Sequence, residues 1–310
     1  MELNENIYDV IIIGAGPAGM TAALYASRSG LKTKLIEKGV PGGQLLNTDL
    51  VENYTGAGLI GGAELAENME QDAFRFGAED AFGDVTGISF DNETKLHSVH
   101  TKTEEYKTKT VIVSTGTTNK KLGVPGELEL AGKGVSYCAI CDGAFFKGKE
   151  LVVIGGGDSA VEESLYLTQF ASKVTLIHRR DKLRAQKILQ DRFFAHPKTE
   201  VVWDSIVYSI NGQDAFKGVS VINKNGEESK LESAGAFIYV GLLPNTEAFS
   251  DLGITNEEGF IVTDNLMQTE IAGVYAVGDV RNTPLRQIST AVADGAIAGN
   301  EVFKYIQENF

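Results

Sequence analysis

Short apolar runs followed by glycine turns recur along the chain, and they predict the buried strands of parallel sheets. The two clearest examples are residues 8–38 and 149–179. In each, an apolar run leads through a glycine turn into a helical pattern and then a second apolar run. This order of elements is typical of a βαβ unit that binds a dinucleotide. We therefore predict the same nucleotide-binding unit twice, the alternative being two ordinary glycine turns of an α/β protein.

The two units align without a gap, and the alignment identifies their important glycines. In such a unit the first glycine permits a tight turn, the second lets the backbone approach the pyrophosphate, and the third position lets helix and strand pack closely. The pyrophosphate then lies on the unpaired N–H groups of the helix start. The aligned pairs are Gly14 with Gly155, Gly16 with Gly157, and Gly19 with Ala160.

The residue that ends the second strand of each unit differs in charge. Glu37 ends the first, and a carboxylate accepts hydrogen bonds from a ribose 2′-hydroxyl but repels a 2′-phosphate. His178 ends the second and is followed by Arg179 and Arg180, with Arg184 a little further on. Arginine offers a planar fork of donors that matches phosphate oxygens. We therefore predict FAD at the first unit and NADPH at the second; a solvated basic run is the alternative for the arginines.

The rest of the chain alternates further strand and helix patterns. Helical spacing is shown by Leu65, Met69, Asp72 or Ala73, and Phe76. A polar region from Ile88 to Tyr106 predicts short antiparallel strands in which His97 and His100 are exposed. Residues 108–116, 235–246 and 271–280 predict buried strands, and residues 286–306 predict a helix rich in small residues.

Two of these buried strands end in glycine turns, at Gly116 and Gly241, and predict matching crossings between domains. We expect an α/β fold of two Rossmann-like domains, the NADPH domain (117–245) being inserted into a discontinuous FAD domain (1–116 and 246–310). Element order alone would also permit tandem domains with a tail. The insertion is favoured because the terminal helix needs a sheet to cover.

Composition narrows the class of protein. A net charge of −14 and a pI near 4.8 argue against nucleic acid or an anionic membrane as the main partner. The N-terminal residues are acidic where a signal peptide would be basic. No segment approaches the roughly 20 apolar residues of a membrane span. A cytoplasmic location follows as the expectation.

Cys138 and Cys141 are the only cysteines. A structural zinc site requires four ligands, and only four scattered histidines remain, so we predict no metal. A purely stabilising disulfide is disfavoured because so short a loop removes little chain entropy. Beside two redox-cofactor sites, the Cys-x-x-Cys pair is best explained as an active dithiol/disulfide.

Electron counting connects these sites. NADPH delivers a hydride, a flavin accepts two electrons, and a disulfide needs two to become a dithiol, so one cysteine must meet the flavin and the other an external disulfide. Asp142 follows directly and is the nearest titratable group. It is either the proton donor to the departing thiolate or the N-cap of a following turn, and the residues alone leave both open.

Taken together, these motifs make the chain resemble the low-molecular-weight thioredoxin reductases over its whole length. The resemblance implies that Cys141 faces the flavin, that Cys138 attacks the disulfide of thioredoxin, and that Asp142 is the acid. It also implies a homodimer. It rests on Gly14-x-Gly16-x-x-Gly19 with Glu37, Cys138-Ala-Ile-Cys141-Asp142, Gly155-Gly-Gly157-Asp-Ser-Ala160, His178-Arg179-Arg180, Phe237-Ile-Tyr-Val-Gly241 and Val277-Gly278-Asp279-Val280.

The resemblance also completes the two sets of expected cofactor residues. For FAD they are Gly14, Gly16, Pro17, Ala18, Gly19, Glu37, Gly43, Gln44, Asn53, Thr115, Gly116, Gly278, Asp279, Arg286, Gln287 and Ile288. For NADPH they are Gly155, Gly157, Asp158, Ser159, Ala160, His178, Arg179, Arg180 and Arg184.

Three questions about the partner protein and the activity stay open. The run Ala144-Phe145-Phe146 either docks the partner protein, as the resemblance implies, or belongs to the core. The acceptor could instead be a glutaredoxin-like protein or a peroxidase-linked carrier. The chain could also be a slow flavoprotein redox sensor, whereas a ferredoxin-type reductase is disfavoured because it would not need the two cysteines.

Overall fold

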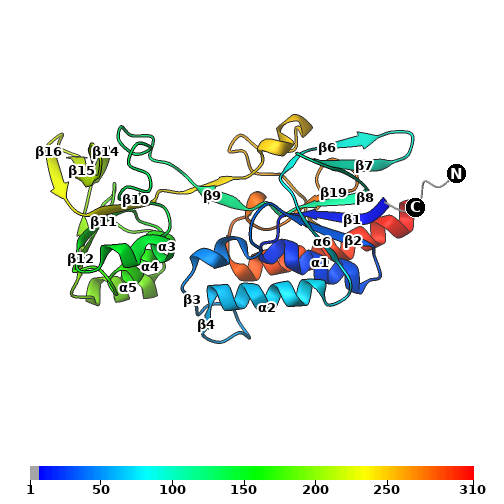
Figure 1. Cartoon of the computed structure of the whole chain (residues 1–310), viewed down its shortest axis with the longest axis horizontal. Helices are drawn as coiled ribbons and strands as arrows, with labels where there is room; N and C mark the ends of the chain where they lie inside the picture. The colour runs from blue at the N-terminus through cyan, green and yellow to red at the C-terminus, as the bar shows by residue number, and fades with distance from the viewer. Residues whose placement is uncertain (1–6) are drawn as a thin grey trace. The chain divides into compact units, whose positions relative to one another are not determined.

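The structure is a computed structural model that describes residues 7–310, and within it the chain divides into two compact units. The first unit contains the described residues up to Thr118 together with Pro244–Phe310, and the second is Asn119–Leu243 (Figure 1). Residues 1–6, on which part of the signal-peptide argument depends, lie outside the described residues. Each unit contains a mainly parallel sheet with helices packed on it, and the predicted α/β class with two Rossmann-like sheets is confirmed.

The sheet of the first unit has a parallel part and an antiparallel part. Its strand order is β5-β2-β1-β8-β7-β6, and β19 also pairs with β8. The apolar run from Ile7 to Ile13 forms the central strand β1, which is parallel to both its neighbours. The strands are β1 Ile7–Ile13, β2 Thr33–Glu37, β5 Glu79–Phe82, β6 Val85–Asp91, β7 Leu96–Thr101, β8 Glu105–Val113 and β19 Val274–Ala276, with a separate short pair, β3 Leu50–Val51 and β4 Ile60–Gly61.

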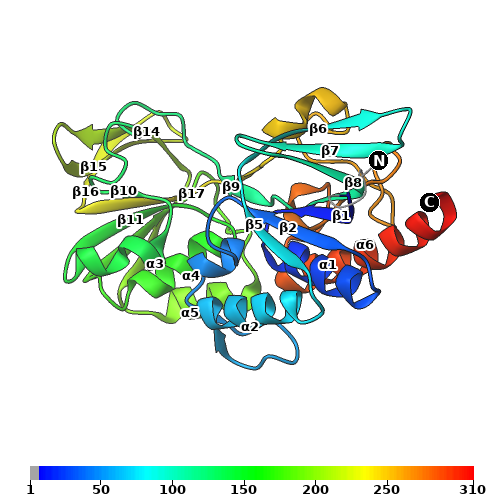
Figure 2. The same ribbon diagram turned by 45° about the vertical axis from the view of Figure 1, so that its right-hand side comes forward.

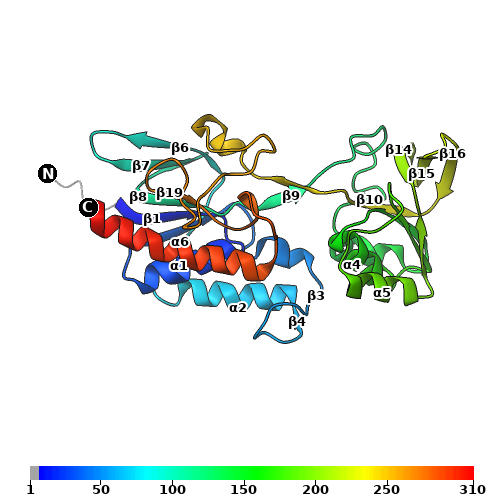
Figure 3. The ribbon, with the colours of Figure 1, turned by 180° about the vertical axis from the view of Figure 1, so that it is seen from behind.

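Three helices, α1 (Pro17–Arg28), α2 (Gly62–Phe74) and α6 (Ile288–Asn309), lie on the same side of this sheet, as the view from behind in Figure 3 shows. The small residues of α6 are explained by its packing on α1. A Cβ on Gly295 would lie 2.3 Å from the Ala18 carbonyl oxygen, so only glycine permits this approach of the two helices.

The opposite face of the sheet is buried by the 3₁₀-helix η3 (Glu247–Leu252) and the segment that follows it. Ile11 and Val111 of the sheet pack here with Phe249 and Ile261. The chain thus returns from residue 244 onward to cover both faces of a sheet that its first part began. Two further 3₁₀-helices of this unit are η1 (Gly43–Asn47) and η4 (Gly278–Val280).

The second unit is a parallel sheet between two unlike layers, which Figure 2 shows from one side. Its helices form one core with the sheet, which includes Phe193 and Phe237. A three-stranded antiparallel sheet, β14-β15-β16, covers the other face through Val219 and Val221. The parallel strands are β10 Val135–Ser136, β17 Gly235–Tyr239, β11 Glu150–Gly155, β12 Lys173–Ile177 and β13 Thr199–Val202, in that spatial order. The other elements are α3 Ala139–Asp142, η2 Gly143–Phe146, α4 Asp158–Leu167, α5 Lys187–Ala195, β14 Ser205–Gly212, β15 Phe216–Asn223 and β16 Glu228–Glu232.

The two predicted crossing segments form the short strands β9 (Thr117–Asn119) and β18 (Leu242–Pro244), which pair with each other. Next to them, Thr115 Oγ1 donates a hydrogen bond to the Asn245 carbonyl oxygen (2.6 Å). Asn245 Nδ2 donates in return to the Thr115 carbonyl oxygen (2.8 Å). The ends of the two segments are therefore held together by reciprocal hydrogen bonds.

Two expectations are wrong. His97 is 1% exposed, because it points from β7 into the unit, where Nε2 lies 3.1 Å from the Ala272 carbonyl oxygen. This burial lowers the pKa of His97 below its ordinary value, although the hydrogen bond to Ala272 opposes the change. Phe76 lies beyond the end of α2 and is 48% exposed, whereas Leu65, Ala66 and Ala73 of that helix enter the core. No helix in residues 7–310 is long and apolar enough to cross a membrane.

Candidate functional site

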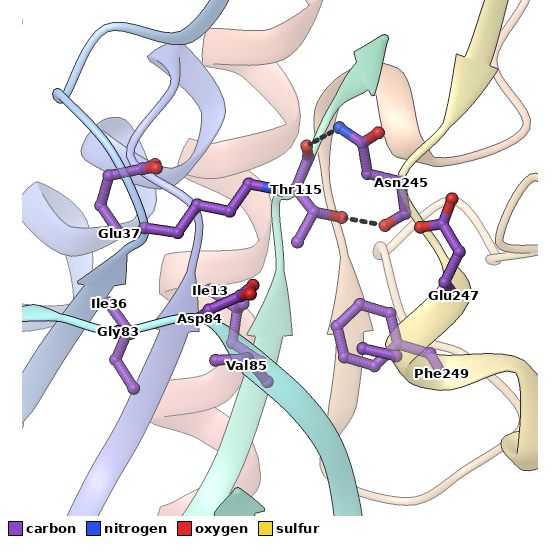
Figure 4. A pocket seen from close by; sticks show the side chains of 13 residues that line it. Ile13, Ile36, Glu37, Gly83, Asp84, Val85, Thr115, Asn245, Glu247 and Phe249 are labelled. Carbon is purple, nitrogen blue, oxygen red and sulfur yellow. Dashed lines mark hydrogen bonds between the residues drawn. The ribbon is translucent and has the colours of Figure 1, made fainter. Parts of the chain in front are cut away.

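The first glycine turn and Glu37 line one pocket of about 180 Å³ in the first unit. The Gly14 backbone has φ +103°, and a Cβ there would lie 2.6 Å from the Ser114 carbonyl oxygen, so only glycine makes this turn against β8. Thr115, two residues beyond the end of β8, lines the same pocket with Asn245 (Figure 4). The structure thus brings three predicted FAD residues, Gly14, Glu37 and Thr115, to one cavity.

Glu37 binds the glycine turn as well as facing the pocket. Its Oε2 accepts a hydrogen bond from the Ala15 backbone N–H (2.7 Å) and its Oε1 accepts one from the Gly39 N–H (2.9 Å). A carboxylate has about four lone-pair positions, so the group retains capacity for ribose hydroxyls. The sequence prediction named Glu37 only as a ligand residue, whereas the structure shows that it also holds the turn.

The other predicted FAD residues continue from this turn along the first unit. A Cβ on Gly43 would lie 3.2 Å from Gly16 Cα, and one on Gly278 would lie 2.9 Å from Ala18 Cβ, so each of these pairs is in close approach. Pro17 opens α1 and Gly19 lies in its first turn against Gly14. Gln44 Nε2 donates to the Thr117 carbonyl oxygen (2.8 Å), Asn53 Nδ2 donates to Gln287 Oε1 (3.0 Å), Gly116 accepts from the Asn245 N–H (3.0 Å), and Ile288 packs with Leu45.

Asp279 and Arg286 form an electrostatic pair near Gly278. Burial raises the pKa of Asp279 above its ordinary value, the Arg286 guanidinium opposes this, and Asp294 adds to it. Arg286 lies 4.2 Å from the centroid of the Phe260 ring, and its Nε is buried without a hydrogen-bond partner among the described residues. A buried donor without an acceptor is costly, and it is the kind of atom that a bound ligand satisfies.

The glycine turn of the second unit is built from the same parts. A Cβ on Gly155 would lie 2.5 Å from the Tyr239 carbonyl oxygen and 2.6 Å from Ala160 Cβ, so strand and helix are in close approach here. The Asp158 carboxylate accepts from Gln186 N (2.7 Å) and Gln186 Nε2 (2.9 Å), and Ser159 is exposed at the start of α4. The glycine turn is thereby joined to the chain that follows β12.

The second glycine of each turn faces open space. A Cβ built on Gly16 or on Gly157 meets no protein atom within 4 Å. Protein packing therefore does not explain glycine at either position. Close approach by a pyrophosphate would account for both, because a side chain would stand between the ligand and the helix start.

The basic segment after β12 is available to a ligand. Arg179, Arg180 and Arg184 are exposed, and within residues 7–310 their guanidinium groups form no hydrogen bond or ion pair. The Arg184 backbone N–H donates to the Gly156 carbonyl oxygen (2.7 Å), which places this segment against the glycine turn. Three cations beside a helix start are suited to bind a phosphorylated nucleotide.

His178 lies behind this segment rather than on its surface. Its ring is 4% exposed, Nδ1 lies 2.7 Å from the Gly155 carbonyl oxygen, and Nε2 lies 2.9 Å from the Lys182 carbonyl oxygen. A Cβ on Gly156 would lie 2.2 Å from this ring. His178 thus connects the glycine turn to the basic segment through main-chain contacts.

Cys138 and Cys141 form a disulfide in the second unit, with their Cα atoms 5.4 Å apart. Cys138 is the N-cap residue of α3, and its Sγ accepts a hydrogen bond from the Cys141 backbone N–H (3.2 Å). Cys141 is exposed and Cys138 half-buried. An N–H that points at a sulfur stabilises its thiolate, which is the reactive form.

The structure bears on one of the two alternatives for Asp142, the N-cap of a following turn. It occupies the N-cap position of η2, but its side chain makes no capping hydrogen bond. A structural N-cap needs that bond, so the carboxylate is free for a chemical role.

The two phenylalanines that follow differ in burial. Phe146 packs edge-on against Phe237 in the core, whereas Phe145 is 82% exposed.

Comparisons with known proteins identify the family of the chain. Residues 8–295 match the model of the pyridine nucleotide-disulphide oxidoreductase family. The thioredoxin reductase of Bacillus subtilis is 55% identical over 306 residues, which is 98% of this chain and 96% of that protein. The chain belongs to the low-molecular-weight thioredoxin reductases of this family.

Solved structures of thioredoxin reductases agree with this family assignment. One from Lactococcus lactis, in its FR conformation, has a TM-score of 0.95 and 52% identity, covering 97% of this chain and 99% of that chain. One from T. acidophilum has a TM-score of 0.92 and 38% identity over 97% of this chain and 99% of that chain. Membership of the family makes the chain an oxidoreductase with FAD and NADPH as its cofactors and a redox-active disulfide.

The residues present fit these two cofactors. The space in front of Gly16 and Gly157 suits two pyrophosphates, and the buried Nε of Arg286 is an unsatisfied donor in the first unit. Other residues that line the pocket with Glu37 were missed by the sequence analysis: Asp84, Val85, Glu247, Ala248 and Phe249. Asp84 and Val85 lie between β5 and β6 and at the start of β6, and the other three lie in η3. No local motif marks them, so only the fold brings them to Glu37. Within residues 7–310 no cluster of three or more histidine, cysteine or acidic side chains could hold a metal ion.

Glu37→Ala is expected to weaken FAD binding about ten- to a hundredfold, because a hydrogen bond to a charged group contributes about 1.5–3 kcal/mol. The measurement is the dissociation constant of FAD, from the fluorescence of flavin released on dilution. Glu79→Ala is the matched control, since Glu79 lies on the same sheet but pairs with Lys34 and Tyr8 away from the pocket. A Glu37→Ala protein with the wild-type dissociation constant would contradict the ribose contact.

Proposed function

We propose that the chain is an NADPH-dependent thioredoxin-disulfide reductase that passes two electrons, through FAD and the Cys138–Cys141 disulfide, to oxidised thioredoxin. The observation that carries this proposal is the disulfide with one exposed and one half-buried cysteine, in the unit that also holds a nucleotide-binding turn and an unpaired basic segment. The names of its relatives support thioredoxin as the acceptor.

We further propose separate roles for the two units. The first binds FAD through the glycine turn at Gly14, Glu37 and the residues around Gly278. The second binds NADPH through the turn at Gly155 and the three arginines Arg179, Arg180 and Arg184, whose charges select the 2′-phosphate. Bound FAD supplies the two-electron chemistry that links a nicotinamide to a disulfide.

The cysteines then perform a balanced exchange of sulfur bonds. Once the Cys138–Cys141 bond is reduced, the Cys138 thiolate attacks one sulfur of the thioredoxin disulfide, forming a mixed disulfide and releasing the other sulfur as a thiolate. The Cys141 thiolate next attacks Cys138 Sγ, which re-forms the Cys138–Cys141 bond and releases the second thioredoxin sulfur. The Cys141 N–H that now contacts Cys138 Sγ would stabilise the attacking thiolate.

Asp142 is proposed as the proton donor in this exchange. Its carboxyl group makes no capping hydrogen bond and directly follows Cys141 in the chain. A carboxylic acid near a departing thiolate lowers the barrier by protonating it as it leaves. The proton passes to the sulfur as its bond breaks, and solvent returns a proton to Asp142 afterwards.

The remaining proposals concern the partner, assembly and location. The exposed ring of Phe145 would contact thioredoxin near the disulfide, as its 82% exposure allows. The family resemblance supports a homodimer, which sedimentation of the purified protein would test. It also supports action in the cytoplasm, where the disulfides of carrier proteins must be kept reduced.

One spectroscopic experiment tests the proposed function. Purified protein should show flavin absorbance that NADPH bleaches and oxidised thioredoxin restores, with rapid NADPH consumption only when thioredoxin is present. Restoration by a glutaredoxin but not by thioredoxin would change the acceptor. Slow NADPH consumption with every carrier would favour a redox sensor, and a colourless protein that takes up no flavin would contradict the proposal entirely.

A further inference from the structure

Tyr137, the residue before Cys138, is held at three points. Its hydroxyl donates a hydrogen bond to Glu127 Oε1 (2.7 Å), and its carbonyl oxygen accepts one from Asn119 Nδ2 (2.9 Å). The Lys121 ammonium lies 4.0 Å from the centroid of its ring. The hydroxyl, the ring and the main chain of this residue are therefore all fixed by neighbours in the second unit.

Glu127 is a buried anion, only 1% exposed. Besides Tyr137, it accepts hydrogen bonds from the backbone N–H of Leu122 (2.9 Å) and of Gly123 (2.7 Å). Burial alone would raise the pKa of Glu127, but the hydrogen bonds from Tyr137 and the main chain outweigh it and lower that pKa below its ordinary value. The carboxylate therefore stays ionised and binds the phenol as a strong acceptor.

The loop that carries Glu127 has a rigid base. Its Pro125 carbonyl oxygen accepts a hydrogen bond from the Ile210 N–H (2.9 Å) on β14. Gly126 approaches the same strand so closely that a Cβ would lie 2.2 Å from the Ile210 carbonyl oxygen. A side chain anchored to this loop is thus anchored to the three-stranded sheet.

These contacts reach Cys138 through one peptide bond. The Tyr137 carbonyl, bound by Asn119, belongs to the same planar peptide group as the Cys138 N–H, which donates to Ser136 Oγ (3.1 Å). On the other side of the cysteine, the Ala139 N–H donates to the Tyr239 hydroxyl (2.9 Å). Cys138 therefore lies between two peptide groups whose orientation neighbouring side chains determine.

We propose that Tyr137 and Glu127 are positioning residues that fix the direction in which Cys138 Sγ meets the substrate disulfide. The inference rests on the proposed function, because it concerns the attack of Cys138 on thioredoxin. Reacting atoms must be aligned within a few tenths of an ångström, and a displacement of about 1 Å can cost about a hundredfold in rate. In this proposal both residues act through the peptide before Cys138 and not by contact with the substrate.

Tyr137→Phe is the principal test, since it removes the hydroxyl and leaves the ring packed against the core beneath the three-stranded sheet. We expect the kcat for thioredoxin to fall about tenfold while the KM for thioredoxin stays within twofold. NADPH-dependent reduction of a small quinone, which takes electrons from reduced flavin without a thiol, should be unchanged. Tyr208→Phe is the matched control, because Tyr208 also donates to a glutamate, Glu228, but on the exposed three-stranded sheet.

Two further variants test the network at other points. Asn119→Ala removes the hydrogen bond to the Tyr137 carbonyl and should lower the same kcat. Glu127→Gln places an amide beside the N–H groups of the loop, and combined with Tyr137→Phe it should cost less than the sum of the two single changes. If Glu127→Gln fails to fold, Tyr137→Phe and Asn119→Ala still decide the question.

The outcomes separate this inference from the proposed function. Wild-type protein that does not turn over thioredoxin would contradict the proposed function. If the wild type is active, a Tyr137→Phe protein whose ratio of thioredoxin to quinone activity is within twofold of the wild type overturns the positioning role. An equal fall in both activities also overturns it, because it would show a general structural loss.

Discussion

Cys138→Ser is expected to abolish thioredoxin reduction, lowering kcat by more than about a thousandfold, because serine cannot form the mixed disulfide. NADPH-dependent reduction of a small quinone should continue at the wild-type rate, since that reaction needs no cysteine. The variant keeps the size of the side chain in a half-buried position, so the fold of α3 should be preserved. The two rates are measured by NADPH absorbance with each acceptor in turn.

Ser136→Ala is a suitable control for this experiment. Ser136 contacts the Cys138 main chain through its hydroxyl but carries no sulfur. It should alter thioredoxin turnover far less than Cys138→Ser does. Normal thioredoxin turnover by the Cys138→Ser protein would refute the dithiol mechanism.

Replacing Arg179 and Arg180 together by alanine is expected to raise the KM for NADPH about a hundredfold. Each charge-assisted hydrogen bond to the 2′-phosphate contributes about 1.5–3 kcal/mol, and the exposure of both arginines places them at the lower end of that range. The KM for NADH, which lacks the phosphate, should change less than about twofold. Steady-state kinetics with both nucleotides measures the two effects.

The control removes the same amount of charge from another part of the second unit. Lys217 and Lys230 are exposed on β15 and β16, and their double replacement by alanine should leave the KM for NADPH unchanged. If the arginine variant raises the KM for NADPH and NADH equally, the 2′-phosphate is not what these residues recognise. Equal effects of the arginine and lysine variants on the KM for NADPH would point instead to the electrostatic potential of the whole protein.

The parts of the fold that sequence analysis predicts are those whose signal is local. The strands β1 and β11 with their glycine turns, and the helices α1 and α4 that follow, each lie within one short stretch of apolar periodicity. Our sequence interpretation assigns no element to residues 199–232, although β13–β16 occupy this stretch. In β14 the pairing register shifts between Val207 and Ser209 and again between Asn211 and Gly212, which interrupts the alternation that identifies a strand.

The candidate site also contains residues that a local sequence pattern predicts and residues that it does not. Glu37 ends one strand and the arginines follow another, at fixed distances from the glycine turns, so these residues can be predicted from sequence alone. Val85 and Phe249 reach the pocket beside Glu37 from distant parts of the chain, and Glu127 reaches Tyr137 only because the loop folds back on itself. These contacts depend on tertiary packing, and no short motif encodes them.

The packing of Gly156 against His178 has a consequence for attempts to change the coenzyme preference of the chain. In the FAD unit the equivalent positions are Ala15 and Glu37, and there the alanine N–H bonds to the carboxylate. A methyl group at position 156 would collide with the imidazole, whereas exchanging only the imidazole for a smaller acid would leave a gap beside the turn. Redesign for NADH therefore requires the two positions to be exchanged as a pair, before any arginine is altered.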